Sequence, residues 1–447
     1  MPQREESFVA SESSASARPS IDCSVLPSQT TPAPLVLRAR TFAVLALLCA
    51  VAAAVGLRFA NSLQGTDFPD FYCAARMLAD GRGNQLYNSE VQRQYQARYA
   101  GRVGTLYIHP PFEAVLYLAV AWLPLRRGYL LWSFLNLALM AIAARHLSKE
   151  VLFPWDWHFL AAAALTFAPL LLCCIQGQDS MLLLLLLVLA FTALRRGRAF
   201  AAGCWFGLGL FKFQFILPVV LVLVLTQSKT ARNALARGFI LVALALAGLS
   251  AAICGWPVFA AYPKFLAHLP QEPFAGIVPL AMANFRGLTY FFLDRNQSPW
   301  AVAVVVILCV AALIKTLIDW KRAQLSSNRS PSTSSDEFDL AFTSTVLFGL
   351  LVSYHLNPHD LTLSLLPISL LLHLHLKQKS GLAGTSNWIP IGLLAILFLP
   401  PLHLWALRTG SYATVGLALL SLFLVAVPIA RKDIALQAGQ PCARPPV

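Results

Sequence analysis

The stretch PWAVAVVVILCVAALIKTLI, residues 299–318, decides the fold class. Its only charged residue is Lys315, close to one end. A helix needs about 20 apolar residues to cross the hydrocarbon core of a bilayer, so this run is long enough to span a membrane. Comparable runs occupy residues 41–58, 128–147, 157–177, 238–258, 386–407 and 410–430, and shorter ones occupy 110–125, 179–194, 198–211, 213–227, 340–356 and 360–376.

The composition of the chain agrees with this pattern. Of its 447 residues 57% are hydrophobic and only 12% are charged, about half the usual share for a soluble domain. This excludes a soluble enzyme, a disordered chain and a nucleic-acid-binding protein. The formal net charge of +14 comes from Lys and Arg that cluster between apolar runs, as membrane topology requires. We therefore predict an all-α integral membrane protein with about twelve transmembrane or half-membrane helices.

The basic clusters also predict the orientation and the domain limits. Lys and Arg are enriched in cytoplasmic loops, which places both termini in the cytoplasm and makes the protein multi-pass in the cell membrane. The predicted segments are a disordered cytoplasmic tail at 1–37, a transmembrane domain at 38–432, outer loops at 59–109 and 257–298, a Ser-rich cytoplasmic linker at 319–338 and a cytoplasmic tail at 433–447.

The region 110–198 has two possible topologies. If residues 110–125 cross the membrane, five basic residues farther along lie outside and two lie inside. If the segment is re-entrant, the five lie inside and the two lie outside. The positive-inside rule favours re-entry, which places the segment QGQD at 176–179 on the outer side.

The outer loop 59–109 contains two helix signatures. The first has Pro69 in its first turn and Gly81 as a stop. The second begins at Asn88 and ends at Gly101. Each has an aromatic face, and Tyr and Trp favour the headgroup level, so we expect both helices to lie flat on the outer leaflet.

The segment GTDFPDFY, residues 65–72, places Asp67, Asp70 and Tyr72 at the membrane surface. Partial desolvation raises the pKa of a carboxyl group toward that of a general base. The alternative is that Asp67 or Asp70 caps the helix, where a negative charge suits the helix dipole.

Polar residues also occur inside or beside the apolar runs. Glu113 is ionisable within an apolar stretch, and His109 precedes it at the interface; such groups are functional candidates. Gln178 lies in the outer QGQD segment. Lys212 has 13 uncharged residues before it and 16 after it, so it either snorkels or neutralises an anion within the bundle.

Two later segments supply further candidates. Arg286, in the second outer loop, is placed to bind a phosphate if residues 282–287 return toward the membrane. In the segment NPHD, residues 357–360, His359 is a candidate hydrogen-bond donor to a phosphate or to Asp360. Pro358 breaks the helix that would align two histidines, so no metal site is predicted, and no cofactor is expected.

The order of these motifs resembles glycosyltransferase family 87. The resemblance rests on an aspartate and aromatic segment after the first membrane helix, on Leu86-Tyr87, on Tyr107 with Pro110-Pro111-Phe112, on Gly177-Gln178, on Gly203 to Lys212, and on His359-Asp360-Leu361. It covers about residues 40–375.

The resemblance implies a GT-C-type helical bundle that transfers a hexose, mannose above all, from a polyprenyl phosphate. The acceptor would be a lipid-linked or cell-envelope glycan on the outer face, and the reaction would invert the anomeric carbon. Asp67 would be the catalytic base. Lys212, Arg286 and His359 would bind the donor phosphate, because such a leaving group needs cations. Asp70, Tyr72, His109, Glu113, Gln178 and Asp360 would bind the acceptor or shape the site. The alternative is a multi-spanning transporter or lipid flippase, but the two internal repeats often seen in transporters are not evident.

Overall fold

The computed structural model describes residues 65–101, 103–151, 157–271, 277–296, 298–327, 331–379, 389–398 and 400–428, with isolated positions between 40 and 63. The predicted tails 1–37 and 433–447, and most of the predicted span 41–58, lie outside the described residues. Every regular element of the described part is helical, which confirms the predicted all-α class.

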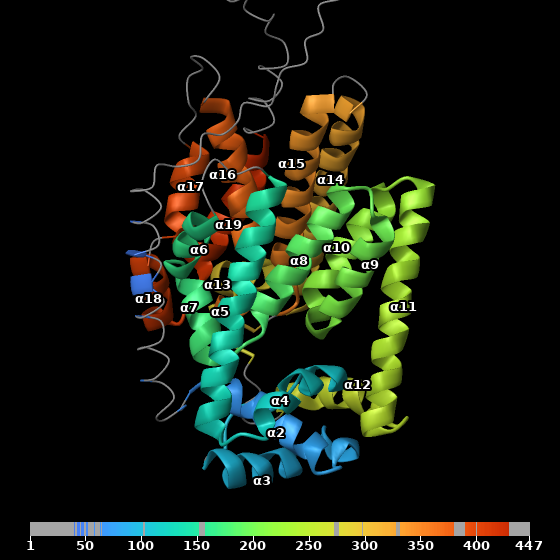
Figure 1. The fold of residues 1–447 in the computed structure, drawn as a ribbon, viewed down its shortest axis with the longest axis vertical. Coiled ribbons are helices and arrows are strands. Elements are labelled where there is room, and N and C mark those ends of the chain that lie inside the picture. The colour runs from blue at the N-terminus through green and yellow to red at the C-terminus, as the bar shows by residue number, and fades with distance from the viewer. Residues whose placement is uncertain are drawn as a thin grey trace, which may run out of the picture.

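Long helices form an upright bundle (Figure 1). The longest are α5 (Leu125–Glu150), α11 (Lys229–Cys254), α14 (Pro299–Ser327) and α15 (Pro331–Val352). In the described residues five helices are long and apolar enough to cross a membrane, or seven if each of two bent pairs counts as one span. The runs 128–147 and 299–318 are thus confirmed as the central part of α5 and the first part of α14.

Shorter helices complete the bundle around a buried centre. The central helix is α8 (Ser180–Arg195), whose side chains are almost all buried. The others are α6 (Trp157–Leu165), α7 (Ala168–Gln176), α9 (Ala199–Leu208), α10 (Phe213–Thr226), α13 (Phe285–Phe292), α16 (Leu365–Lys379), α17 (Ile389–Phe398), α18 (Pro400–Thr409) and α19 (Ala413–Ser421), which is followed by the π-helical turn η7 (Leu422–Ala426). The bent pairs are α6 with α7, at 71°, and the last part of α17 with α18, at 55°. Proline lies in the first turn of the second helix of each pair and cannot donate the hydrogen bond that would continue the first.

Two predicted short runs form a single span. Residues 198–211 and 213–227 appear as α9 and α10, joined by the 3-10 turn η3 (Gly209–Lys212) into one apolar span over Ala199–Thr226. Lys212 interrupts the hydropathy pattern, which is why the sequence indicates two pieces. The charge is accommodated because it lies in the 3-10 turn and has partners from other helices.

A layer of short helices lies across one end of the bundle (Figure 1). It contains α2 (Phe68–Ala79), the 3-10 turn η1 (Gly83–Gln85), α3 (Ser89–Ala100), the 3-10 helix η2 (Pro111–Tyr117), α4 (Leu118–Ala121) and α12 (Val258–His268), which is followed by the 3-10 turn η4 (Leu269–Gln271). The predicted caps of α3 are confirmed: the Asn88 side chain accepts hydrogen bonds from two backbone N–H groups of the first turn, and Gly101 has a left-handed φ of 67°.

The expectation that the aromatic face of α2 lies on a lipid surface is wrong. Phe68 and Phe71 on α2 are at most 1% exposed. The Phe71 ring stacks on Tyr117 at 4.6 Å, and Phe68 meets Tyr129 of α5 edge-on at 5.4 Å. Burying these rings against η2 and α5 removes them from water and lipid alike, so the layer is packed protein.

The segment 111–121 does not cross the bundle. It is eleven residues long, well below the length that spans a bilayer, and α5 starts at the same end of the molecule (Figure 1). This agrees with the predicted re-entrant segment.

The predicted linker 319–338 is largely helical. The helix α14 continues to Ser327 and α15 begins at Pro331, a favoured residue for a first helical position. Asp336, in this region, pairs with Lys377 of α16 at 2.8 Å, and Asp339, just after it, pairs with Arg195 of α8 at 3.3 Å. The first of these ion pairs holds a residue that the composition alone assigns to the linker.

Candidate functional site

Asp67 immediately precedes α2 and turns its carboxylate away from the helix. It occupies the N-cap position but makes no side-chain hydrogen bond to the first turn, so the capping alternative is not observed. Its Oδ2 instead accepts a hydrogen bond from Nε2 of Gln178 at 2.7 Å. Its backbone N–H donates to Oε1 of Gln176 at 3.0 Å. Two glutamines of one turn therefore hold Asp67 at both its backbone and its carboxylate.

The turn that carries these glutamines requires glycine. Gly177 follows α7 and has a φ of +67°. A Cβ at this position would lie 2.6 Å from Cβ of Phe68. The next carbonyl, that of Gln178, accepts hydrogen bonds from Asn136 at 2.8 Å and Trp132 at 3.3 Å, both on α5. The turn is thus fixed against α5 on one side and α2 on the other.

Lys212 is buried in a cluster of charged and polar side chains. Its Nζ lies 2.6 Å from Oδ1 of Asp360 and 3.2 Å from Oδ1 of Asp179. It also donates to Ser180 Oγ at 3.0 Å and to Gln178 Oε1 at 3.3 Å. The lysine does not snorkel, and two carboxylates already neutralise its charge. A donor phosphate would have to compete with both.

The amide of Gln178 links this cluster to Asp67. Because the Lys212 ammonium is only a donor, it must meet the amide oxygen, and this directs the amide nitrogen to Asp67. The sequence predicts Gln178 as a site residue but gives no sign of this orientation, which depends on a lysine 34 residues away.

Asp70 has a different set of partners. Its carboxylate accepts hydrogen bonds from Gln96 Nε2 at 3.0 Å and from the Thr105 hydroxyl. Gln96 and Gln92 lie one turn apart on α3, and both are almost fully buried. Gln92 accepts from the backbone N–H of Tyr107 at 2.7 Å. The buried face of α3 is therefore partly polar, because it holds Asp70 and the extended segment 104–107.

Three other predicted residues lie around the same centre. His109 Nδ1 is 3.0 Å from Oε1 of Glu113, which is fully buried. The Tyr72 hydroxyl donates to the Leu123 carbonyl at 2.8 Å and is not among the cavity-lining residues. Tyr72 therefore stabilises the contact between α2 and the turn before α5, and a direct role in acceptor binding is not supported by its position.

The histidines after α15 complete the centre. The 3-10 helix η6 (Pro358–Ser364) carries His359, whose Nε2 is 3.6 Å from Asp360, longer than a hydrogen bond. Burial lowers the pKa of His355 to about 4, so this imidazole is neutral at neutral pH and can donate one hydrogen bond.

These residues surround a cavity of about 230 Å³ where the layer of short helices meets the bundle. Its lining includes Asp67, Asp70, His109, Gln178, Lys212, Tyr354, His355, His359 and Asp360. The structure thus brings together polar groups from segments as distant as 67 and 360. Arg286, on α13, lies outside this cavity but beside its edge: its guanidinium carbon is 4.2 Å from the ring centre of Tyr354.

A model of glycosyltransferase family 87 matches residues 107–330, half of the chain. The chain belongs to glycosyltransferase family 87. No curated protein matches it. Together with its apolar helices, this makes the protein a membrane glycosyltransferase.

The family match includes only part of the site of this glycosyltransferase. His109, Gln178 and Lys212 fall within residues 107–330, whereas Asp67 and Asp360 fall outside. The contacts of Gln178 with Asp67 and of Lys212 with Asp360 therefore join the matched region to flanking segments.

Several residues of this site were not identified from the sequence. They are Gln96, Thr105, Ser180, Tyr262 and Asn357. Only Gln96 could have been found from the sequence. It is four residues from Gln92, among tyrosines, and this spacing places both glutamines on one helix face. The others are single polar residues whose partners are distant in sequence.

The Gly177 turn gives a test of how the site is held. Gly177→Ala is expected to destabilise the protein by more than the ~1–2 kcal/mol of left-handed strain and to lower turnover, since the new methyl group displaces Phe68 beside Asp67. The control is Gly197→Ala, at a φ of +69° with no atom within 4 Å, which adds only the strain. Thermal unfolding midpoints in detergent and turnover are compared. Equal effects of the two variants would show that the contact with Phe68 is unimportant.

Proposed function

We propose that the enzyme transfers a hexose, mannose above all, from a polyprenyl phosphate to a hydroxyl of a lipid-linked or cell-envelope glycan at the outer face of the membrane. The observation that carries this proposal is the carboxylate of Asp67. It lines the cavity and makes no capping hydrogen bond, and Gln178 holds it from one side. A carboxylate held in this way is suited to accept a proton from an acceptor hydroxyl.

The reaction follows from this placement. Asp67 takes the proton of the acceptor hydroxyl as the oxygen forms a bond to the anomeric carbon of the sugar. The bond from that carbon to the phosphate oxygen breaks, and polyprenyl phosphate leaves on the opposite face, so the configuration inverts. The leaving phosphate carries its charge away without a proton, so cations and hydrogen-bond donors stabilise it.

The donors for this phosphate are, in our proposal, Arg286 and His359, with neutral His355 beside them. His355 and His359 line the cavity, and Arg286 lies at its edge on Tyr354. Lys212, proposed from the sequence for the same role, is placed differently here: its ion pairs with Asp179 and Asp360 make it the residue that orients Gln178.

The position of the site within the chain supports the proposed topology. Both predicted outer loops, 59–109 and 257–298, contribute to the cavity, through Asp67 and Asp70 in the first and Tyr262 and Leu266 in the second. We propose that this end of the bundle faces outward, that both termini are cytoplasmic, and that residues 38–432 form the catalytic domain.

Purified protein with a radiolabelled polyprenyl-phosphate mannose tests the function. A transferase converts the label into a glycan product and releases polyprenyl phosphate in equal amount. A flippase, the competing class, moves the labelled lipid between leaflets of a proteoliposome and leaves it intact. Intact lipid with changed sidedness would overturn the proposal.

Removing the amide of Gln178 tests its contact with Asp67. Gln178→Leu is expected to lower kcat by about tenfold to hundredfold with little change in KM for the donor, because a misplaced base slows only the chemical step. Gln214→Leu, at another glutamine that lines the same cavity, is the control and should stay near wild type. A wild-type kcat for Gln178→Leu would show that Asp67 does not depend on this hydrogen bond.

A further inference from the structure

An apolar groove lies beside the polar cavity. It has a volume of about 260 Å³ and runs between α13, α14 and the end of α15. Apolar side chains of α14 and α15 form one wall of it: Ala301, Val302, Val305, Val306, Leu351 and Val352. Val302 and Val306 are more than half exposed, so the groove opens on the apolar outer surface of the bundle.

Polar donors are concentrated on one helix of this groove. Arg286 and Thr289 lie one turn apart on α13 and therefore share a face. The Thr289 side chain is 95% buried, and its hydroxyl has no hydrogen-bond partner among the described residues. A buried hydroxyl without a partner is costly, so this one indicates a missing acceptor. Asp294, past the other end of α13, accepts hydrogen bonds from the backbone of Asn296 and Ser298.

The groove and the cavity meet at one residue. Tyr354 lines both. Arg286 packs over its ring and donates to its carbonyl oxygen at 3.3 Å, which holds the guanidinium at the border. An amphiphile with a phosphate at this border would have its chain in the groove and any group beyond the phosphate in the cavity of Asp67.

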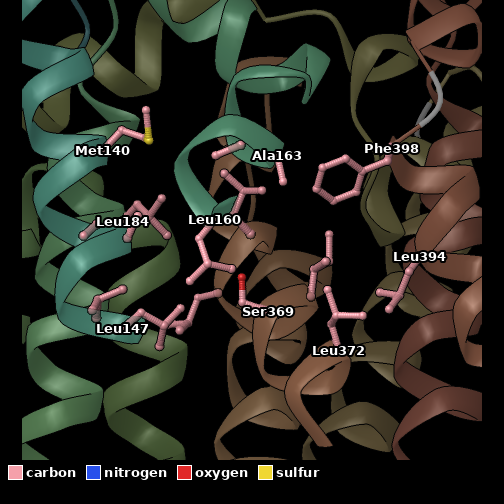
Figure 2. A pocket seen from close by; sticks show the side chains of 16 residues that line it. Met140, Leu147, Leu160, Ala163, Leu184, Ser369, Leu372, Leu394 and Phe398 are labelled. Carbon is pink, nitrogen blue, oxygen red and sulfur yellow. The ribbon is translucent and has the colours of Figure 1, made fainter. Parts of the chain in front are cut away.

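A second apolar cavity offers a comparison. It has about 320 Å³ and lies between α5, α6, α8, α16 and α17 (Figure 2). Ser369 is the one polar side chain among its lining residues, and none of them is charged. The lining of this cavity therefore has no cation that would pair with a phosphate.

We propose that the groove between α13, α14 and α15 binds the isoprenoid chain of the lipid donor, with the phosphate at Arg286, between Thr289 in the groove and His355 and His359 in the cavity. This inference rests on the proposed function, since it needs a lipid-linked sugar phosphate as the donor. It adds that the enzyme distinguishes donors by chain length as well as by sugar: a chain long enough to fill the groove makes van der Waals contacts with its wall that a shorter chain lacks.

Two tryptophan variants at exposed positions test this assignment. Val302→Trp narrows the groove, and Ala163→Trp narrows the comparison cavity. KM is measured with two mannosyl phosphates that differ only in the length of the isoprenoid chain. We expect Val302→Trp to raise KM for the long-chain donor by about tenfold or more, equivalent to ~1.4 kcal/mol, and to leave KM for the short-chain donor within about twofold. Ala163→Trp should change neither. The opposite pattern, with the selective loss in Ala163→Trp, would overturn the proposal.

A binding experiment separates this inference from the proposed function. A photoreactive polyprenyl phosphate that carries no sugar needs no transfer to give a signal. Crosslinks within residues 285–306 support the groove, and crosslinks within α5, α6 or α8 overturn it. If an ordinary phospholipid without an isoprenoid chain suppresses these crosslinks equally well, the groove is a general lipid site and the proposal fails. Failure of sugar transfer with crosslinks still in the groove would instead count against the proposed function alone.

Discussion

Asp67→Asn is expected to lower kcat by about a hundredfold to ten-thousandfold, the usual scale for loss of a general base, with little change in KM for the donor. Asparagine keeps the size of the side chain and an oxygen that can accept the hydrogen bond of Gln178. It loses only the capacity to take a proton. Single-turnover measurements with saturating donor would isolate the chemical step.

Asp70→Asn is the matched control, three residues away and lining the same cavity. Its carboxylate is occupied by Gln96 and Thr105, so the substitution should cost stability, about 1–3 kcal/mol, while most of the turnover remains. If Asp70→Asn is inactive and Asp67→Asn is not, Asp70 is the base. If both variants transfer sugar normally, the proposed mechanism is wrong.

Lys212→Met is expected to prevent stable folding rather than to weaken donor binding. The substitution leaves Asp179 and Asp360 buried without their cation, and breaking a buried ion pair in this way costs about 3–5 kcal/mol. The measurement is the yield of monodisperse protein in detergent, together with its thermal unfolding midpoint. Lys377→Met, which breaks the half-exposed pair with Asp336, should have a much smaller effect.

A double variant distinguishes charge balance from phosphate binding. Lys212→Met combined with Asp360→Asn removes one positive and one negative charge and leaves only Asp179 without its cation, so it should recover part of the lost yield. If Lys212→Met alone is as stable as wild type but has a raised KM for the donor, Lys212 binds the phosphate as the sequence first indicates.

The helices of this enzyme are largely readable from its sequence, because length and apolar composition determine what can cross a bilayer. The run 128–147 corresponds to α5, and the caps at Asn88 and Gly101 mark both ends of α3. The prediction was incomplete where a charge interrupts an apolar run, as at Lys212. Such a charge is stable only with its partners, and Asp360 is 148 residues away.

The candidate site is likewise predictable from the sequence only in part. Asp67, Gln178 and His359 are recognisable as polar residues near membrane edges, and the structure places all three around one cavity. The role of each depends on contacts that no local pattern contains. Nothing near Gln178 in sequence indicates that its amide joins Asp67 to Lys212, and nothing near Asp70 points to Thr105.

The two ion pairs of Lys212 have a consequence for biogenesis. Asp179 and Lys212 belong to consecutive segments, so they can neutralise each other soon after the ribosome has delivered α9 and α10 to the membrane. Asp360 is synthesised much later and adds a second negative charge to a pair that is already neutral. Its segment must therefore enter a partly assembled bundle, with Ser180 and Asn357 supplying hydrogen bonds to the incoming carboxylate. Truncation before residue 358 would leave a bundle whose first half is charge-balanced but whose cavity beside Asp67 lacks one wall.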